Sequence, residues 1–262
     1  MNKVEIKKNN QILHIILNRP QVHNALDVEM IEELREAFAL PITDLSIRAI
    51  LVTGKGKSFC AGADLEYMRS MVDFSLSDNI TDAGRLFAMF ESGLRCPVPV
   101  VVKVQGKVMG GAIGLVAIAD YSVAETGTQF CFSEVRLGLV PAVISPFVLR
   151  KMKVPLAREW MLTGQYFSAD QALRGELIQF VGSSEDGSLQ AERMIESILS
   201  AGPEAVRETK SLITQLEVCN DWLEIRDLTT RVIAERRVSE EGQEGIRAFF
   251  EKRLPKWKPL AP

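Results

Sequence analysis

Three short segments share one form, in which a strand runs into a tight turn and the turn opens a helix. In two of them the turn is rich in glycine, and a helix N-terminus presents backbone N–H groups that have no acceptor within the helix. Two such turns facing each other could direct two N–H donors at one developing oxyanion, and each donor is typically worth about 3 kcal/mol. The segments are 58–68 (SFCAGADLEYM), 105–120 (QGKVMGGAIGLVAIAD) and 130–148 (FCFSEVRLGLVPAVISPFV).

The third segment adds a carboxylate to these turns. Glu134 is the only acidic residue between Gln129 and Pro146. General acid–base catalysis needs such a group to give or take a proton at a fixed position. A lone glutamate beside apolar residues is, on its own, more often a solvated surface group or a helix cap. The chemistry of Glu134 therefore depends on where the fold places it.

Other site types find little support in the residue pattern. A phosphate-binding loop ending in the GKS at 56–58 needs a glycine five residues before Gly56, where Leu51 stands. The four cysteines form no CxxC pair and there are only two histidines, so we expect no metal site. A serine hydrolase is disfavoured because GxSxG is absent and both histidines, His14 and His23, precede residue 24.

Composition limits the partners. Lys and Arg total 31 against 34 Asp and Glu, and this balance gives no general attraction to nucleic acid or to an anionic membrane surface. The N-terminal residues MNKVEIKKNN contain no apolar signal core, and the longest uncharged apolar run, Val108 to Ala119, is too short to span a bilayer. We expect a cytoplasmic protein, although an organelle protein that has lost a presequence stays open.

The elements that must position the three segments follow from hydrophobic periodicity. Strand–strand–helix units recur near 1–40 and 98–124. We expect a mixed strand and helix body over 1–200 and a helical region over 201–262, with no strand after residue 200. The polar stretch 73–82 predicts a mobile loop, either a lid over an acyl group or simply an exposed loop. Strands are predicted at 4–8, 12–17, 47–53, 98–104, 121–124 and 129–132, and helices at 27–41, 64–72, 83–94, 110–119, 155–163, 169–173, 190–199, 203–216, 222–238 and 241–253.

In this order and spacing, the three segments resemble the enoyl-CoA hydratase/isomerase (crotonase) superfamily. The likeness extends to NRPQVHNALD at 18–27 and to EGIRAFFEKRLPKW at 244–257. It implies an α/β fold, a crotonase-like spiral of ββα units with a C-terminal helical trimerisation region. It also implies an acyl-CoA thioester substrate, no separate cofactor because coenzyme A is part of that substrate, and a homotrimer or homohexamer.

The resemblance also assigns roles to residues. The two oxyanion donors fall on the N–H groups of Ala63 and Gly111. Polarising the thioester carbonyl makes the β-carbon electrophilic or the α-proton acidic, so hydration and isomerisation both follow from this device. Contacts to coenzyme A, mostly through the backbone, fall on Val22, His23, Ala25, Ala61, Asp64 and Leu65.

The resemblance is incomplete at one catalytic position. The best-known hydratases of the family use two glutamates; the second matches Glu134, but the place of the first holds Gly114. A hydratase with one carboxylate must use Glu134 to activate water, and the same residue or a water to deliver the α-proton. We hypothesise that the space left at Gly114 accommodates a substrate with its own distal carboxylate, which a glutamate there would repel.

A finer likeness agrees with that hypothesis. GGAIGLVA together with SEVRLGLVPAVISPFV is similar to methylglutaconyl-CoA hydratases of leucine degradation and to isohexenylglutaconyl-CoA hydratases, whose substrates carry a second carboxylate. We therefore expect hydration of 3-methylglutaconyl-CoA or a similar compound. Arg136, Lys103 and Lys107 are possible partners for the distal carboxylate, with a plain surface charge slightly preferred for Arg136. An isomerase, a decarboxylase, or a noncatalytic acyl-CoA-binding or RNA-binding member stays open.

Overall fold

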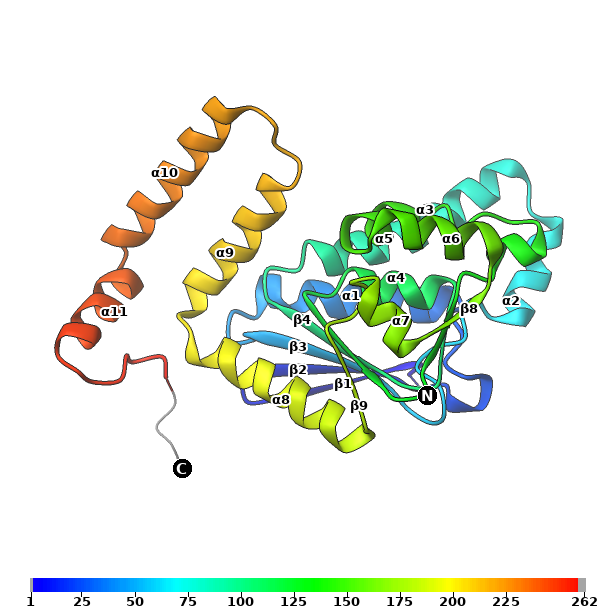
Figure 1. Cartoon of the computed structure of the whole chain (residues 1–262), viewed down its shortest axis with the longest axis horizontal. Helices are drawn as coiled ribbons and strands as arrows, with labels where there is room; N and C mark the ends of the chain where they lie inside the picture. The colour runs from blue at the N-terminus through cyan, green and yellow to red at the C-terminus, as the bar shows by residue number, and fades with distance from the viewer. Residues whose placement is uncertain (1, 259–262) are drawn as a thin grey trace.

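A six-stranded sheet lies at the centre of the computed structural model, which describes residues 2–258 (Figure 1). The first two strands form an antiparallel hairpin, and every other neighbouring pair is parallel. Parallel strands of this kind are buried on both faces, which suits their Val- and Ile-rich sequences. In spatial order the strands are β1 (Val4–Asn9), β2 (Ile12–Leu17), β3 (Ala49–Gly54), β4 (Val100–Val104), β6 (Tyr121–Glu125) and β9 (Phe180–Gly182).

A smaller sheet branches from the large one. It contains β5 (Lys107–Met109), β7 (Gln129–Cys131) and β8 (Tyr166–Ser168), with β5 parallel and β8 antiparallel to β7. The chain passes from β4 into β5 through a bend at Gly106, where φ is +62°. A Cβ at this position would lie 1.9 Å from the Lys57 carbonyl oxygen, so only glycine fits the bend.

Helices cover both faces of the large sheet (Figure 1). Side chains alternate along β4, so that Val100, Val102 and Val104 enter the main core while Val101 packs against Ala191 and Ile195 on the other face. The strand–strand–helix order recurs along the chain, as in the spiral of ββα units. The main-core face carries α1 (Val28–Thr43), α3 (Leu76–Leu94) and α4 (Gly111–Ala117), and the other face carries α8 (Ser184–Ser200).

The last three helices extend away from the sheets (Figure 1). They are α9 (Pro203–Leu216), α10 (Trp222–Val238) and α11 (Glu240–Phe250), and no strand follows β9 within residues 2–258. Arg207 of α9 holds the extension to the body by donating to the carbonyl oxygens of Pro41 and Ile47. The division into units at 1–200 and 201–262 stays a prediction, and its ends, residues 1 and 262, lie outside the described residues.

The predicted elements agree with the structure in most places, but several short ones were missed. The strands and α-helices omitted are β5, β8, β9 and α5 (Ser145–Lys151), all of seven residues or fewer, too short for periodicity to reveal. The start of α8 lies at Ser184 rather than 190, and α11 ends at Phe250 rather than 253. The remaining elements are η1 (Pro20–Val22), α2 (Leu65–Ser70), η2 (Met71–Asp73), η3 (Glu134–Leu137), α6 (Val154–Thr163) and α7 (Ala169–Arg174).

The predicted mobile loop at 73–82 is wrong. Helix α3 begins at Leu76, and Ser75 and Asp78 form a capping box in which each side chain accepts from the other residue's backbone N–H. Such a box satisfies two of the donors that a helix start leaves unpaired. The Ser-x-x-Asp spacing was visible in the sequence and outweighs the polar, turn-prone composition.

The described residues hold neither a membrane-spanning helix nor a cluster of metal-binding side chains. No helix within 2–258 is both long and apolar enough to cross a membrane. Over the same residues, no group of three or more His, Cys, Asp or Glu side chains is arranged to hold a metal ion.

Candidate active site

The loop that carries Ala63 is fixed on one side by Leu26. The Leu26 N–H donates to the Gly62 carbonyl oxygen at 2.8 Å, and the Asp64 N–H donates to the Leu26 carbonyl oxygen at 2.9 Å, so Leu26 and Ala63 form a single parallel bridge. The Gly62 carbonyl and the Asp64 N–H, on either side of Ala63, thus face Leu26. In extended backbone the Ala63 N–H then points away from Leu26.

The other side of this loop runs along β5. Cys60 and Val108 form a second parallel bridge, in which the Met109 N–H donates to the Cys60 carbonyl oxygen at 3.1 Å. Gly62 then lies against Met109: its φ is +94°, and a Cβ there would be 3.0 Å from the Met109 carbonyl oxygen. A side chain at 62 would separate the two segments, which explains the glycine in this part of the loop. The Ala63 loop therefore lies beside the turn that leads into α4.

Gly111 is the first residue of α4, so its N–H has no acceptor within the helix. Among the hydrogen bonds found in residues 2–258, neither the Gly111 N–H nor the Ala63 N–H donates to a protein acceptor. A Cβ at Gly111 would lie 3.2 Å from Cδ1 of Leu26, the residue whose backbone pairs with Ala63. One leucine thus contacts both predicted donor residues.

Glu134 joins this pair through the small sheet. Met109 of β5 pairs with Cys131 of β7, and the Gly110 N–H donates to the Cys131 carbonyl oxygen at 3.0 Å. Three residues later the chain enters η3 with Glu134 as its first residue. A Cβ at Gly110 would lie 3.1 Å from Glu134 Oε1, so the carboxyl group contacts the residue directly before Gly111.

The environment of Glu134 disfavours its charged form. Oε2 is buried and has no hydrogen-bond partner among the described residues. Burial raises the pKa of the Glu134 carboxyl above its ordinary value, partly offset by a hydrogen bond from its own backbone N–H. A carboxyl group with a raised pKa beside unused N–H donors is suited to accepting a proton and returning it.

The hypothesis of an empty space at Gly114 is wrong. A Cβ at Gly114 would lie 2.5 Å from Cζ of Phe90 and 2.9 Å from Cγ2 of Ile144, and both side chains are buried. The Phe90 ring is in turn packed against Phe147, with ring centroids 5.5 Å apart. Gly114 is a glycine because an aromatic ring occupies the side-chain position, and a distal substrate carboxylate has no room there. Sequence spacing could not reveal this contact, because Phe90 and Gly114 come from different helices.

The three predicted cationic partners occupy different surroundings. Lys103 forms a 2.8 Å ion pair with Glu125 on the face of the sheet covered by α8, away from the main core, so it is not a partner for a substrate carboxylate. Arg136 is exposed, with its guanidinium carbon 5.5 Å from the centroid of the Tyr166 ring, which agrees with the surface charge preferred from sequence. Lys107 is exposed at the start of β5.

The residues predicted to contact coenzyme A lie along two paired segments. The Ala61 N–H donates to the His23 carbonyl oxygen at 3.0 Å, which joins the turn after η1 to the Ala63 loop. Val22 and Leu65 are exposed, whereas Ala25 and Asp64 are buried. The side chain of Asp64 is occupied by protein groups, because its Oδ1 accepts from the Glu66 and Tyr67 N–H groups in the first turn of α2. Its other oxygen binds Arg19, a residue to which sequence reasoning assigned no role.

A family model described as enoyl-CoA hydratase/isomerase matches residues 7–259. The chain belongs to this family. The match covers every element described above except the first residues of β1, and the fold is the crotonase fold expected for the family.

Individual members of the enoyl-CoA hydratase/isomerase family align with nearly the whole length of this chain. A crystal structure of an enoyl-CoA hydratase from Shewanella pealeana is 37% identical, covers 97% of this chain and 96% of its own, and superimposes with a TM-score of 0.93. Pseudomonas aeruginosa AtuE is 32% identical, covers 98% of this chain and 100% of its own, with a TM-score of 0.95. A trans-2-decenoyl-[acyl-carrier-protein] isomerase from Streptococcus mutans is 28% identical over 95% of both chains.

Proposed function

We propose that the chain is an enoyl-CoA hydratase that adds water across the 2,3 double bond of a 2-enoyl-CoA thioester, with Glu134 as its only acid/base. The observation that carries the proposal is the carboxyl group of Glu134, whose Oε2 is buried without a partner, next to Gly110 and the start of α4 at Gly111. Membership of the enoyl-CoA hydratase/isomerase family supports the thioester as substrate class.

In the proposed reaction, the Ala63 and Gly111 N–H groups donate to the thioester oxygen. Charge moves onto that oxygen as a water molecule attacks carbon 3, and the two donors stabilise the resulting enolate. Ionised Glu134 takes one proton from the attacking water. The protonated Glu134 then returns the proton to carbon 2, so that the elements of water are added and the carboxylate is regenerated.

The proposed substrate is 3-methylglutaconyl-CoA or a similar thioester with a distal carboxylate. Its support is the likeness of the segments around Gly111 and Glu134 to hydratases of such substrates. The contact between Phe90 and Gly114 excludes the position first suggested for the distal carboxylate. Comparing kcat/KM for 3-methylglutaconyl-CoA with that for crotonyl-CoA tests the assignment, and a clear preference for crotonyl-CoA would remove it.

Double-bond isomerisation is a second candidate, and one observation favours it. The Phe90 and Ile144 side chains fill the position where a second acid could stand, which leaves Glu134 as the carboxyl group identified at this turn. A single carboxyl group can take a proton from one carbon and return it to another, and the related Streptococcus mutans protein is named as an isomerase. Following a 2-enoyl-CoA in deuterated water separates the two, because hydration yields a 3-hydroxy product and isomerisation only moves the double bond.

The direct test replaces Glu134 by glutamine, which keeps the shape but cannot carry the proton. We expect kcat to fall by about 10²- to 10⁴-fold, the usual contribution of general acid–base catalysis. Glu125→Gln is the matched control, because Glu125 pairs with Lys103 on the α8 face and its loss leaves the turn at Gly111 untouched. Equal turnover by Glu134→Gln and Glu125→Gln would exclude the proposed role.

We also propose that the chain assembles as a homotrimer through its last three helices, with a homohexamer as the larger alternative. Helices α10 and α11 leave large apolar side chains exposed, among them Trp222, Val238, Phe249 and Phe250. Exposed apolar surface of this extent supports a protein interface. Light scattering coupled to size-exclusion chromatography measures the mass, and a monomer at micromolar concentration would contradict the proposal.

A further inference from the structure

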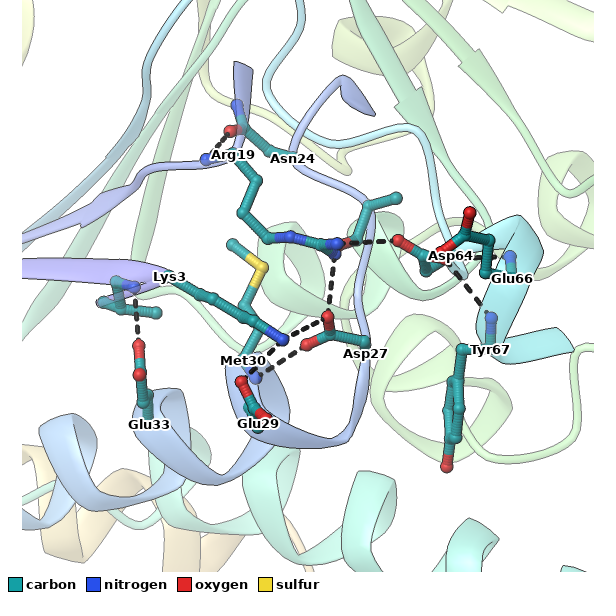
Figure 2. A network of polar contacts seen from close by, with 12 residues as sticks. Lys3, Arg19, Asn24, Asp27, Glu29, Met30, Glu33, Asp64, Glu66 and Tyr67 are labelled. Carbon is teal, nitrogen blue, oxygen red and sulfur yellow. Dashed lines mark hydrogen bonds and ion pairs between the residues drawn. The ribbon is translucent and has the colours of Figure 1, made fainter. Parts of the chain in front are cut away.

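Arg19 lies at the centre of a polar network that joins three segments of the proposed site (Figure 2). Its Nη1 donates to the Ala25 carbonyl oxygen at 2.6 Å and lies 3.1 Å from Asp27 Oδ2. Its Nη2 lies 2.9 Å from Asp64 Oδ2. The side chains of Arg19 and Asp64 are only 15% and 9% exposed, so this contact is largely shielded from water.

The position of Asp64 connects this network to the Ala63 N–H. Asp64 immediately follows Ala63, and its own N–H donates to Leu26. Its Oδ1 accepts from the N–H groups of Glu66 and Tyr67 at the start of α2, while Oδ2 faces Arg19. Both carboxylate oxygens are therefore engaged, and the chain directly after Ala63 has little freedom to rotate.

The planar guanidinium is suited to this position. Arginine presents its N–H groups in a fixed fork, so one side chain binds two carboxylates and a carbonyl oxygen at set angles. A lysine ammonium is a point charge on a shorter reach and cannot reproduce that geometry. On the far side of Asp27, Lys3 forms its own ion pairs, at 2.6 Å to Asp27 and 2.7 Å to Glu29 (Figure 2).

We infer that Arg19 is a positioning residue: by binding Asp64 and Asp27, it holds the Ala63 N–H in the direction required to polarise the thioester carbonyl. The inference rests on the proposed function, because it assumes that the Ala63 N–H is an oxyanion donor. Arg19 itself does not touch the substrate in this scheme. It acts through Asp64, whose loss should therefore have the same effect as the loss of Arg19.

The test measures the thioester carbonyl directly. Butyryl-CoA labelled with ¹³C at the carbonyl is bound to each protein, and its infrared band is compared with that of the free compound. A carbonyl that accepts strong hydrogen bonds absorbs at lower frequency. We expect the wild-type chain to lower the band, and Arg19→Lys and Asp64→Asn to return it toward the free value.

Turnover gives the second measurement. Removing an oxyanion donor outright typically lowers kcat by about 10²–10³-fold, so a misdirected donor should lower it by about 10-fold or more, with a smaller change in KM. The control is Lys3→Gln, which removes a cation from the same network without a contact to Asp64. It should lower thermal stability but leave kcat and the carbonyl band near their wild-type values.

The outcomes separate this inference from the proposed function. If the wild-type chain does not lower the carbonyl band, the oxyanion assignment and hence the proposed function are wrong. If the wild type, Arg19→Lys and Asp64→Asn all lower the frequency of the carbonyl band equally, only the positioning role is wrong. Should Arg19→Lys fail to fold, Asp64→Asn alone decides, because its remaining carbonyl oxygen can still cap α2. The double variant should lose no more activity than either single one, as expected for two residues acting as one unit.

Discussion

Phe90 occupies the space into which any side chain at Gly114 would project, with its Cζ atom 2.5 Å from the position of a Cβ. The two residues come from α3 and α4, and both are buried. The proposed chemistry therefore depends on one carboxyl group, that of Glu134, rather than on a pair.

Gly114→Glu should lower stability and should not raise hydration activity. Inserting side-chain atoms into a packed core typically costs about 1–3 kcal/mol, and a buried carboxylate without a partner adds to that. We expect a lower midpoint in chemical denaturation. Phe90→Ala/Gly114→Glu opens room for the carboxyl group and is the informative companion variant. A smaller loss of stability when Gly114→Glu is added to Phe90→Ala than when it is added to the wild type would confirm the steric cause. A fully stable Gly114→Glu would contradict it.

Glu134→Gln should become more stable relative to the wild type as pH rises. The folded pKa of Glu134 is raised above its ordinary value of 4.5 by burial. The stability contributed by its neutral form is therefore present below the unfolded pKa and is lost as pH rises through the folded pKa. Glutamine does not titrate and avoids this loss. Urea denaturation at several pH values between 4 and 8 measures the difference, which should widen toward the alkaline end.

Glu125→Gln should become less stable relative to the wild type as pH rises, the opposite of Glu134→Gln, and serves as the comparison. Burial alone would raise the pKa of Glu125, but the Lys103 ammonium and the Ser184 hydroxyl hold that pKa below its ordinary value. Its contribution to stability is present above the unfolded pKa and is lost as pH falls through the folded pKa. This variant should be less stable than the wild type near neutral pH and should approach it in acid. Parallel curves for the two variants would contradict both assignments.

Ser75→Ala should destabilise the start of α3 locally. The Ser75 hydroxyl oxygen accepts from the Asp78 N–H, and replacing such a cap by alanine typically costs about 1 kcal/mol. Hydrogen exchange should become faster over residues 76–80 and stay unchanged in the sheets. Ser77→Ala, inside the first turn of the same helix, is the matched control. Unchanged exchange in Ser75→Ala would mean that the capping box does not hold the helix start.

The sequence predicted those parts of the site that depend on local backbone. The glycine-rich turns before two helices could be predicted from the order of residues, and the family resemblance then assigned the donors to Ala63 and Gly111. The family resemblance assigned Glu134 to the same site as Gly111. The pairing of β5 with β7 shows how the carboxyl group comes to lie beside Gly110. What could not be predicted was how side chains from distant segments fill space.

Two residues illustrate that difference. In the sequence, Phe90 is one of several apolar residues on a predicted helix. Only the packing of α3 against α4 brings it to Gly114. Arg19 reads as the end of a strand, and its role appears only when Asp27 and Asp64 are brought to either side of it. The side-chain position at Gly114 is filled, and Arg19 is given its inferred role, by contacts between residues far apart in the chain.

The bridge made by Leu26 has a consequence for how the site can change. Its backbone holds one proposed donor residue and its side chain touches the other, so a shift of this residue moves both amides together. Adjusting one donor independently of the other would require changes outside this leucine. If Ala63 and Gly111 donate as proposed, a substitution at Leu26 should therefore alter both donors, whereas substitutions at Arg19 or Asp64 should alter only that of Ala63.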